Sequence, residues 1–196
     1  MEVEHRGARP SVHESAWVAP TAVLVGDVRI GPDSRVLWNA VLTAEDGHVE
    51  LGERCVVMEH ALLRGRAAHP VIVGDDVLIG PHAHVNGARL AHGAFVATRA
   101  ALFPGAVAGA DAVVAIGAVV HVMSRLPDGD RVPIGCVAVG DPAEVLAPSA
   151  GDEVRRRVQE VDFWRTVYGV PREAGATERM RRQTAWLGAH RTDRIV

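Results

Sequence analysis

Small aliphatic residues recur every six positions through most of the chain, usually followed by Gly or Ala. The clearest run starts at Val73-Gly74 and Ile79-Gly80 and continues, after one shortened step, to Val120. A period of six fits neither an amphipathic helix nor a simple alternating strand. It is typical of a hexapeptide β-solenoid, in which each hexad forms a short strand and a corner, and three hexads make one triangular coil. The pattern therefore predicts an all-β solenoid.

The same six-residue register can be traced back to Leu24. It is interrupted at residues 43–50 and 64–72, which we expect to form loops that leave the coil and return in phase. Inward-facing residues of successive coils then stack as aliphatic ladders, with neighbouring strands about 4.8 Å apart.

The repeat stops near Val120, and the segment PIGCVAVGDP at residues 133–142 is predicted to be a strand that leaves the solenoid. We therefore assign residues 1–145 to a β-helix domain with its exit strand, and residues 146–196 to a C-terminal helical segment.

Two helices are predicted in the C-terminal segment. Residues 152–168 carry an apolar face, made of Val154, Val158, Val161, Trp164 and Val167. We expect this helix to be capped at Ser149 or Asp152 and closed by Gly169 and Pro171. A second helix is expected over residues 176–190. Both should pack along the solenoid or against a neighbouring subunit, because a solenoid leaves faces and ends that need cover.

Composition narrows the function. The chain has 196 residues, 48% of them hydrophobic, and a net charge of −3, which fits one globular domain without a nucleic-acid partner. All 21 basic residues are Arg, so lysine-based chemistry is excluded. The start MEVEHRG lacks the apolar core of a signal peptide. The chain also lacks an apolar span long enough to enter a membrane, so we expect no membrane partner. Cys55 and Cys136 form no metal-like pair, and we expect a cytoplasmic protein.

At this point the sequence resembles the γ-class carbonic anhydrase family. The resemblance covers roughly residues 10–170 and rests on the order of four segments: VAPTAVLVGDVRIG, WNAVL, PVIVGDDVLIG and VAVGDPAEVL. It implies a left-handed parallel β-helix of hexapeptide repeats that assembles as a homotrimer, with a metal ion held by three His ligands between adjacent subunits.

The resemblance equates the three ligand positions with Arg64, Pro81 and Asn86. Neither Arg nor Pro is a zinc ligand, and an amide oxygen alone is a poor one. The supporting residues differ too: Thr43-Ala44-Glu45 and Met58-Glu59 stand where the family has Arg-Gly-Asp and Gln-Asp. We therefore expect no metal, no cofactor and no hydration of carbon dioxide, a reaction that depends on metal-bound water.

Several polar residues nevertheless gather near this position. His84 and Asn86 are two apart on one strand and should face the same way. Arg can hold a carboxylate at two points, and His titrates near neutrality, so the set suits acid–base work on a small anionic molecule at the subunit interface. The catalytic candidates are His82, His84 and Glu59, and the substrate-binding candidates are Arg64, Asn86, Glu45 and His60. We expect Arg64 to lie near Glu59 or Glu45, because an unpaired buried guanidinium is costly.

Other interpretations remain open. His60, His82 and His84 could hold a metal in a shifted site. The protein could instead be a hexapeptide acyltransferase with His82 or His84 as general base, or a non-catalytic trimeric scaffold with solvated corner residues. The remaining histidines show no ligand spacing and are predicted to lie on the surface or in loops: His5, His13, His48, His69, His92, His121 and His190.

Overall fold

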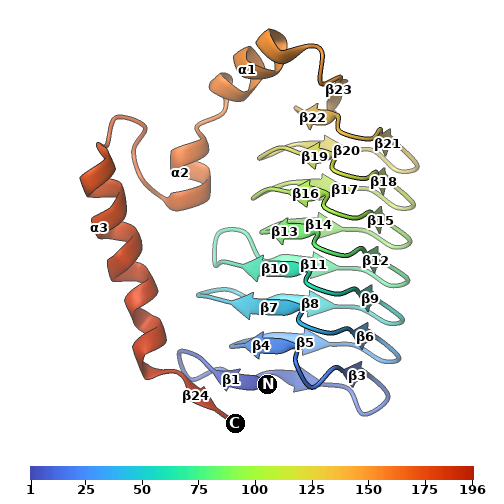
Figure 1. Cartoon of the computed structure of the whole chain (residues 1–196), viewed down its shortest axis with the longest axis vertical. Coiled ribbons are helices and arrows are strands. Elements are labelled where there is room, and N and C mark those ends of the chain that lie inside the picture. Colours follow the sequence, from blue (N-terminus) through green and yellow to red (C-terminus); the bar gives the residue numbers. More distant parts are fainter.

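Each hexad folds as a strand of two to four residues followed by a corner, and three such strands complete one turn of a parallel solenoid. The computed structural model is a left-handed parallel β-helix of about eight turns with a helical C-terminal segment alongside it (Figure 1). It describes the backbone of residues 1–196 and every side chain except those of Val154, Arg155, Val158, Gln159, Phe163, Val167 and Tyr168.

The coil has three sheets. The first, called the long sheet, runs in the order β23 (Glu144–Leu146), β22 (Val137–Val139), β19 (Val119–Val120), β16 (Ala101–Leu102), β13 (His84–Asn86), β10 (Leu62–Gly65), β7 (Val41–Ala44), β4 (Val23–Val25), β1 (Glu2–Glu4) and β24 (Arg194–Ile195).

The second sheet consists of β2 (Ser11–Val12), β5 (Val28–Ile30), β8 (Val49–Leu51), β11 (Val71–Val73), β14 (Arg89–Leu90), β17 (Val107–Ala108) and β20 (Arg125–Leu126). The third sheet consists of β21 (Arg131–Val132), β18 (Val113–Val114), β15 (Phe95–Val96), β12 (Leu78–Ile79), β9 (Val56–Val57), β6 (Arg35–Val36) and β3 (Trp17–Val18).

Aliphatic ladders fill the interior, as the repeat predicts. In the long sheet, parallel pairing aligns one inward residue from each turn: Leu24, Leu42, Leu63, Val85, Leu102, Val120 and Ala138. All seven are at most 1% exposed. The ladder fixes which neighbours on each strand face outward, because successive side chains alternate between the two faces of a strand.

The solenoid is longer at both ends than the sequence pattern predicts. The expected stop near Val120 is wrong, since β20, β21 and β22 continue the coil and β22 pairs in parallel with β19. The chain leaves the solenoid at β23, which pairs antiparallel with β22. At the other end, β1, β2 and β3 form a turn before Leu24 that weak periodicity concealed.

The two interruptions are also shorter than predicted. Thr43 and Ala44 belong to β7, and Arg64 and Gly65 belong to β10. The residues that leave the coil are therefore those around 45–48 and 66–70, and Arg64 is held on a strand.

The first predicted helix is two helices, α1 (Gly151–Glu160) and α2 (Phe163–Tyr168). Asp162 separates them, because its side chain accepts a hydrogen bond from the Arg165 amide (3.1 Å) and caps α2. Asp152 lies within the first turn of α1, so it is no cap, whereas Gly169 closes α2 in the left-handed conformation as predicted. The side chains of Val154, Val158 and Val167 on the predicted apolar face lie outside the described residues.

The second predicted helix is α3 (Ala176–Leu187), and the 3-10 helix η1 (Gly188–Thr192) continues it. The chain then ends in β24, which pairs antiparallel with β1, so the two termini lie together at one end of the molecule (Figure 1). Between these points α3 runs along the long sheet (Figure 1), consistent with the predicted packing of a helix along the solenoid. No helix among the described residues is long and apolar enough to cross a membrane.

Candidate functional site

Three predicted site residues are neighbours on the outer face of the long sheet. In β10, Leu63 points into the core, so Arg64 faces outward. Its register partner on β13 is Asn86, and His84 is the next outward residue along that strand. Strand pairing alone therefore brings Arg64, His84 and Asn86 to one patch of the surface.

Glu45 joins this group through the turn that follows β7. Its amide donates to the carbonyl of Gly65 (3.0 Å), directly after Arg64. Gly65 lies against the end of the same turn, where a Cβ would come 2.0 Å from the His48 carbonyl oxygen. The Glu45 carboxylate, 5% exposed, then reaches 3.6 Å from Arg64 Nε. The prediction that Arg64 lies near Glu45 is confirmed.

A cavity of about 250 Å³, called the Arg64 cavity, lies between this patch and α3. It is lined by Arg64, Arg66, His84, Asn86, Phe103, Gln183, Trp186 and Leu187. The Arg66 guanidinium carbon lies 3.9 Å from the centre of the Trp186 ring, a cation–π contact that ties α3 to the loop after β10. Five of these residues, those besides Arg64, His84 and Asn86, were missed from the sequence. Three of the five lie on α3, whose placement has no local sequence signal.

Buried polar atoms in the Arg64 cavity lack hydrogen-bond partners. Among the described residues these include Arg64 Nε, His84 Nε2 and Asn86 Oδ1. Burial, and next the charge of Arg64, lower the pKa of His84. His84 is therefore a neutral imidazole near pH 7, able to accept a proton.

The other predicted site residues lie elsewhere. Glu59, His60 and His82 sit on the corners that join the third sheet to the long sheet, and none of them lines the Arg64 cavity. The rings of His60 and His82 stack with centroids 4.9 Å apart, while His84 faces the cavity. Within the described part of the chain, these three histidines do not form one metal-ligand group.

The backbone of this corner carries no sign of special strain. His60 and His82 have left-handed φ angles of 59° and 57°, but Asn39 (60°) and Arg99 (58°) adopt the same conformation at the equivalent corners. The left-handed corner is therefore a property of the coil, and it does not mark a functional residue.

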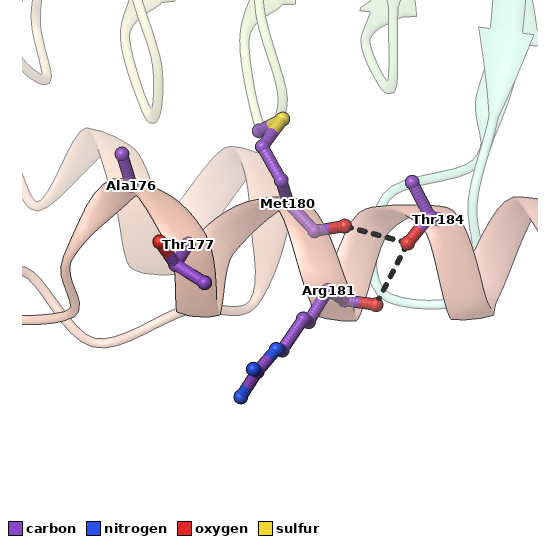
Figure 2. Close-up of a pocket in the computed structure, with 5 residues that line it drawn as sticks. All are labelled: Ala176, Thr177, Met180, Arg181 and Thr184. Atoms are coloured by element: carbon purple, nitrogen blue, oxygen red, sulfur yellow. Dashed lines mark hydrogen bonds between the residues drawn. The ribbon is translucent and has the colours of Figure 1, made fainter.

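A second hollow, of about 470 Å³, is lined by residues of α3 only. Met180 points toward the solenoid and Arg181 away from it (Figure 2). The Thr184 hydroxyl donates to the carbonyls of Met180 (2.8 Å) and Arg181 (3.1 Å) (Figure 2). With its hydroxyl engaged in the helix, this open hollow offers little chemistry.

Two histidines predicted to be surface or loop residues are buried: His5 is 2% and His121 7% exposed. His5 stacks on His190, with ring centroids 4.3 Å apart. His190 Nε2 lies 2.8 Å from Glu45 Oε2, and Asp193 contacts both rings. The residues of this group come from opposite ends of the chain, so no spacing in the sequence predicts that they meet.

The residues at the positions equated with the family's metal ligands do not fit a metal ion. Arg64 is a cation without an acceptor atom, Pro81 has no side-chain donor, and Asn86 offers one amide oxygen. These three side chains therefore offer too few donor atoms to hold a metal ion at this position.

Comparison with known proteins supports the resemblance. No protein-family model matches the chain. "Gamma carbonic anhydrase 1, mitochondrial" of Arabidopsis thaliana is 32% identical over 152 residues, which cover 74% of this chain and 53% of that relative. The chain thus spans about half the length of the first relative. "Carnitine operon protein CaiE" of Escherichia coli is 28% identical over 148 residues, covering 76% of this chain and 72% of that protein.

Among solved structures, a protein of Bacillus cereus described as a putative acetyltransferase is 25% identical. The match covers 80% of this chain and 90% of the other, with a TM-score of 0.55. The solenoid is therefore shared with proteins of more than one activity.

Proposed function

We propose, from the premise that this chain belongs to the γ-carbonic-anhydrase-like family of hexapeptide-repeat β-helices, that it binds a small anionic molecule in the Arg64 cavity and acts on it without a metal at that position. The observation that carries the proposal is the pair of buried atoms without hydrogen-bond partners, His84 Nε2 and Asn86 Oδ1, beside Arg64, whose Nε has Glu45 only at an ion-pair distance of 3.6 Å. Buried polar groups are normally paired, so residues that line one cavity and carry unpaired polar atoms suit a ligand that completes their hydrogen bonds.

The lining suggests the chemistry of that ligand. Arg64 and Arg66 favour a carboxylate, because guanidinium groups donate in a planar fork. Asn86 Oδ1 accepts from a hydroxyl or an amide N–H of the same molecule. Phe103 and Trp186 accommodate a short apolar portion. A small carboxylate bearing one hydrogen-bond donor satisfies all of these groups.

His84 is the proposed general base. As a neutral imidazole on the cavity wall, it can take a proton from a hydroxyl or amine of the bound molecule, while Arg64 holds the carboxylate. A carbonic anhydrase reaction needs a metal-bound hydroxide. His84 and Arg64 do not supply one, so we do not propose that reaction for these residues.

Assembly is part of the proposal. The third sheet carries a stripe of outward apolar residues in register, the half-buried Val56, Leu78 and Val113 and the exposed Phe95. Arg35 separates this stripe from the exposed Trp17. We propose that this stripe packs against a neighbour in the homotrimer that the resemblance implies. The corner with Glu59, His60 and His82 adjoins this sheet, so these side chains would meet the neighbour and contribute to a site at the subunit interface.

Ligand binding tests the proposal directly. A panel of two- to six-carbon carboxylates is screened by thermal shift, and hits are titrated by calorimetry. We expect at least one carboxylate to bind, and Arg64→Ala to weaken its binding about 10- to 100-fold, as for a charge-assisted hydrogen bond. The matched control Arg89→Ala, exposed on β14, should bind like the wild type. If no carboxylate binds, or if Arg64→Ala binds equally well, the scaffold interpretation replaces this one.

Acyl transfer is the second candidate, and the Bacillus cereus neighbour favours it. A neutral His84 would serve as base toward an incoming hydroxyl or amine in this reaction too. Release of free thiol from acetyl-coenzyme A, with a panel of hydroxyl and amine acceptors, distinguishes the two. Acceptor-dependent thiol release that is lost in His84→Ala would select the acyltransferase.

A further inference from the structure

Four ionisable side chains from distant parts of the chain meet beside the end of α3. They are His5, after β1; Glu45, after β7; His190, in η1; and Asp193, before β24. We propose that His5, Glu45 and His190 form a binding site for a divalent cation of the zinc type, with Asp193 as the carboxylate that orients both histidines. This site is separate from the positions of Arg64, Pro81 and Asn86, and it does not depend on the proposed function.

The ligand atoms are close enough to converge on one ion. One donor atom each from His5, Glu45 and His190 lies within 4.8 Å of the other two. Ligand atoms around a tetrahedral zinc lie about 3.3–3.6 Å apart, so a closure of roughly 1 Å completes the geometry. His190 Nε2 and Glu45 Oε2 are 2.8 Å apart, so this pair would instead move apart by roughly 0.5–0.8 Å. Two imidazoles and one carboxylate are a donor set that zinc favours.

Asp193 supports this arrangement from the opposite side of the rings. Its Oδ1 lies 2.5 Å from His5 Nδ1, and its Oδ2 lies 2.8 Å from His190 Nδ1. Each Nδ1 then carries the hydrogen that it donates to Asp193, so Nε2 is the metal-binding nitrogen of both rings. Without metal, His190 Nε2 also donates to Glu45 Oε2, and a bound cation would displace that proton. Metal-binding histidines usually donate their second nitrogen to a carboxylate in this way.

Glu45 divides its two oxygens between neighbours. Oε1 accepts from the Thr43 hydroxyl (3.4 Å) and lies 3.6 Å from Arg64, whereas Oε2 faces His190. Glu45 can therefore bind a cation through Oε2 while Oε1 stays in place. Arg6 Nε, 3.3 Å from His5 Nε2, must move aside, and the exposure of Arg6 allows it.

A bound ion would attach the C-terminal segment to the solenoid. His5 and Glu45 belong to the first and third turns of the solenoid, whereas His190 follows α3. An ion shared by the three would fix the end of α3 against the long sheet, next to the Arg64 cavity.

Titration of the full-length protein tests the site. After treatment with a chelator and desalting, ZnCl2 is titrated by calorimetry, and CoCl2 is added to a parallel sample for its visible absorption. We expect one tight Zn2+ per chain and a Co2+ spectrum of tetrahedral intensity. His5→Ala, Glu45→Gln and His190→Ala should each weaken affinity at least 10-fold, and Asp193→Asn about 10- to 100-fold.

Two controls keep the outcome decisive. His60→Ala removes the exposed His60–His82 pair and should leave the tightly bound Zn2+ unchanged, and so should Arg89→Ala, on an exposed position of β14. If a variant of a proposed metal ligand unfolds, the wild type alone still tests the site. Bound Zn2+ must then slow tryptic cleavage of the wild type at the arginines of α3 at least 5-fold. The proposal is wrong if the wild type binds no Zn2+ tightly, or if tight Zn2+ binding persists in both Glu45→Gln and His190→Ala.

Discussion

His190 and Glu45, 145 positions apart, approach to 2.8 Å between Nε2 and Oε2. The contact joins the segment after α3 to the turn after β7, and the other Glu45 oxygen faces Arg64 at 3.6 Å. Glu45 therefore links the C-terminal segment to the Arg64 cavity. A change in the C-terminal segment that moves Glu45 would therefore also change the contact between Glu45 and Arg64.

Loss of the Glu45 charge should loosen α3. In metal-free buffer, Glu45→Gln replaces a buried acceptor shared by Thr43, Arg64 and His190, which should cost about 1–3 kcal/mol. We expect amide hydrogen exchange in α3 and η1 to speed up about 5- to 100-fold, measured by mass spectrometry, with the exchange of the solenoid core unchanged. Glu50→Gln, on an exposed side chain of β8, is the matched control. Equal exchange in the wild type and Glu45→Gln would show that the contact does not hold the segment.

The inward ladder should dominate the stability of the solenoid. Leu63 is fully buried at the centre of the long sheet, between Leu42 and Val85. Leu63→Ala leaves a cavity that the rigid coil cannot close, and the free energy of unfolding should fall by about 2–5 kcal/mol. Leu187→Ala, at a 43% exposed position, should cost well under half as much in chemical denaturation.

Acidification should destabilise the protein through the half-buried His84 and the buried His121. Burial lowers the pKa of His84 and of His121 below the usual 6.5. The unfolded chain then binds more protons than the folded one below about pH 6.5, so the free energy of unfolding falls as the pH falls through that region. His84→Asn should flatten this decline in a series of urea titrations, and His13→Asn, an exposed control, should not. An unchanged slope in His84→Asn would contradict a neutral, half-buried His84.

His190 should give the opposite pH dependence. Burial lowers its pKa, but the hydrogen bonds that the protonated ring donates to Asp193 and Glu45, and the charges of both carboxylates, outweigh that effect and raise it above 6.5. The stability that His190 contributes is present below pH 6.5 and is lost as the pH rises through its folded-state pKa. His190→Ala should remove the loss of stability on the alkaline side in chelator-treated samples. A wild-type profile that rises steadily above pH 7 would argue against this contribution.

The third sheet should mediate assembly. Phe95 is 40% exposed in the middle of the apolar stripe, so Phe95→Glu places an unpaired charge in the proposed interface. We expect light scattering to report a trimer for the wild type and a monomer for Phe95→Glu. Val107→Glu, between Arg89 and Arg125 on the second sheet, tests the same change on another face and should stay trimeric. A wild-type monomer at micromolar concentration would end the assembly proposal.

The fold can be predicted from the sequence because each six-residue repeat specifies its own strand and corner. Leu63 and Val85 repeat a six-residue rule, and that rule also predicts that Arg64, His84 and Asn86 face outward together. The cavity wall made by Trp186, and the meeting of His5 with His190, depend on where α3 lies against the coil. That placement is set by a few long-range contacts, which leave no period in the sequence. The early end assigned near Val120 has a related cause, since Arg and Pro at outward and corner positions obscure the last turns.

The positions of Arg64, Pro81 and Asn86 should regain a metal before they regain an activity. In a His190→Ala background, which removes the other proposed metal site, Arg64→His, Pro81→His and Asn86→His together supply three imidazoles where the resemblance implies ligands. We expect stoichiometric Zn2+ by elemental analysis but little hydration of carbon dioxide. Thr43 and Met58 remain in place of the supporting Arg and Gln, and altered supporting residues reduce activity 10- to 100-fold or more. The variant that restores only Asn86→His is the control and should not hold zinc. If the triple variant also fails to bind zinc, the three positions do not converge in the assembled protein, and the equivalence drawn from the resemblance is wrong.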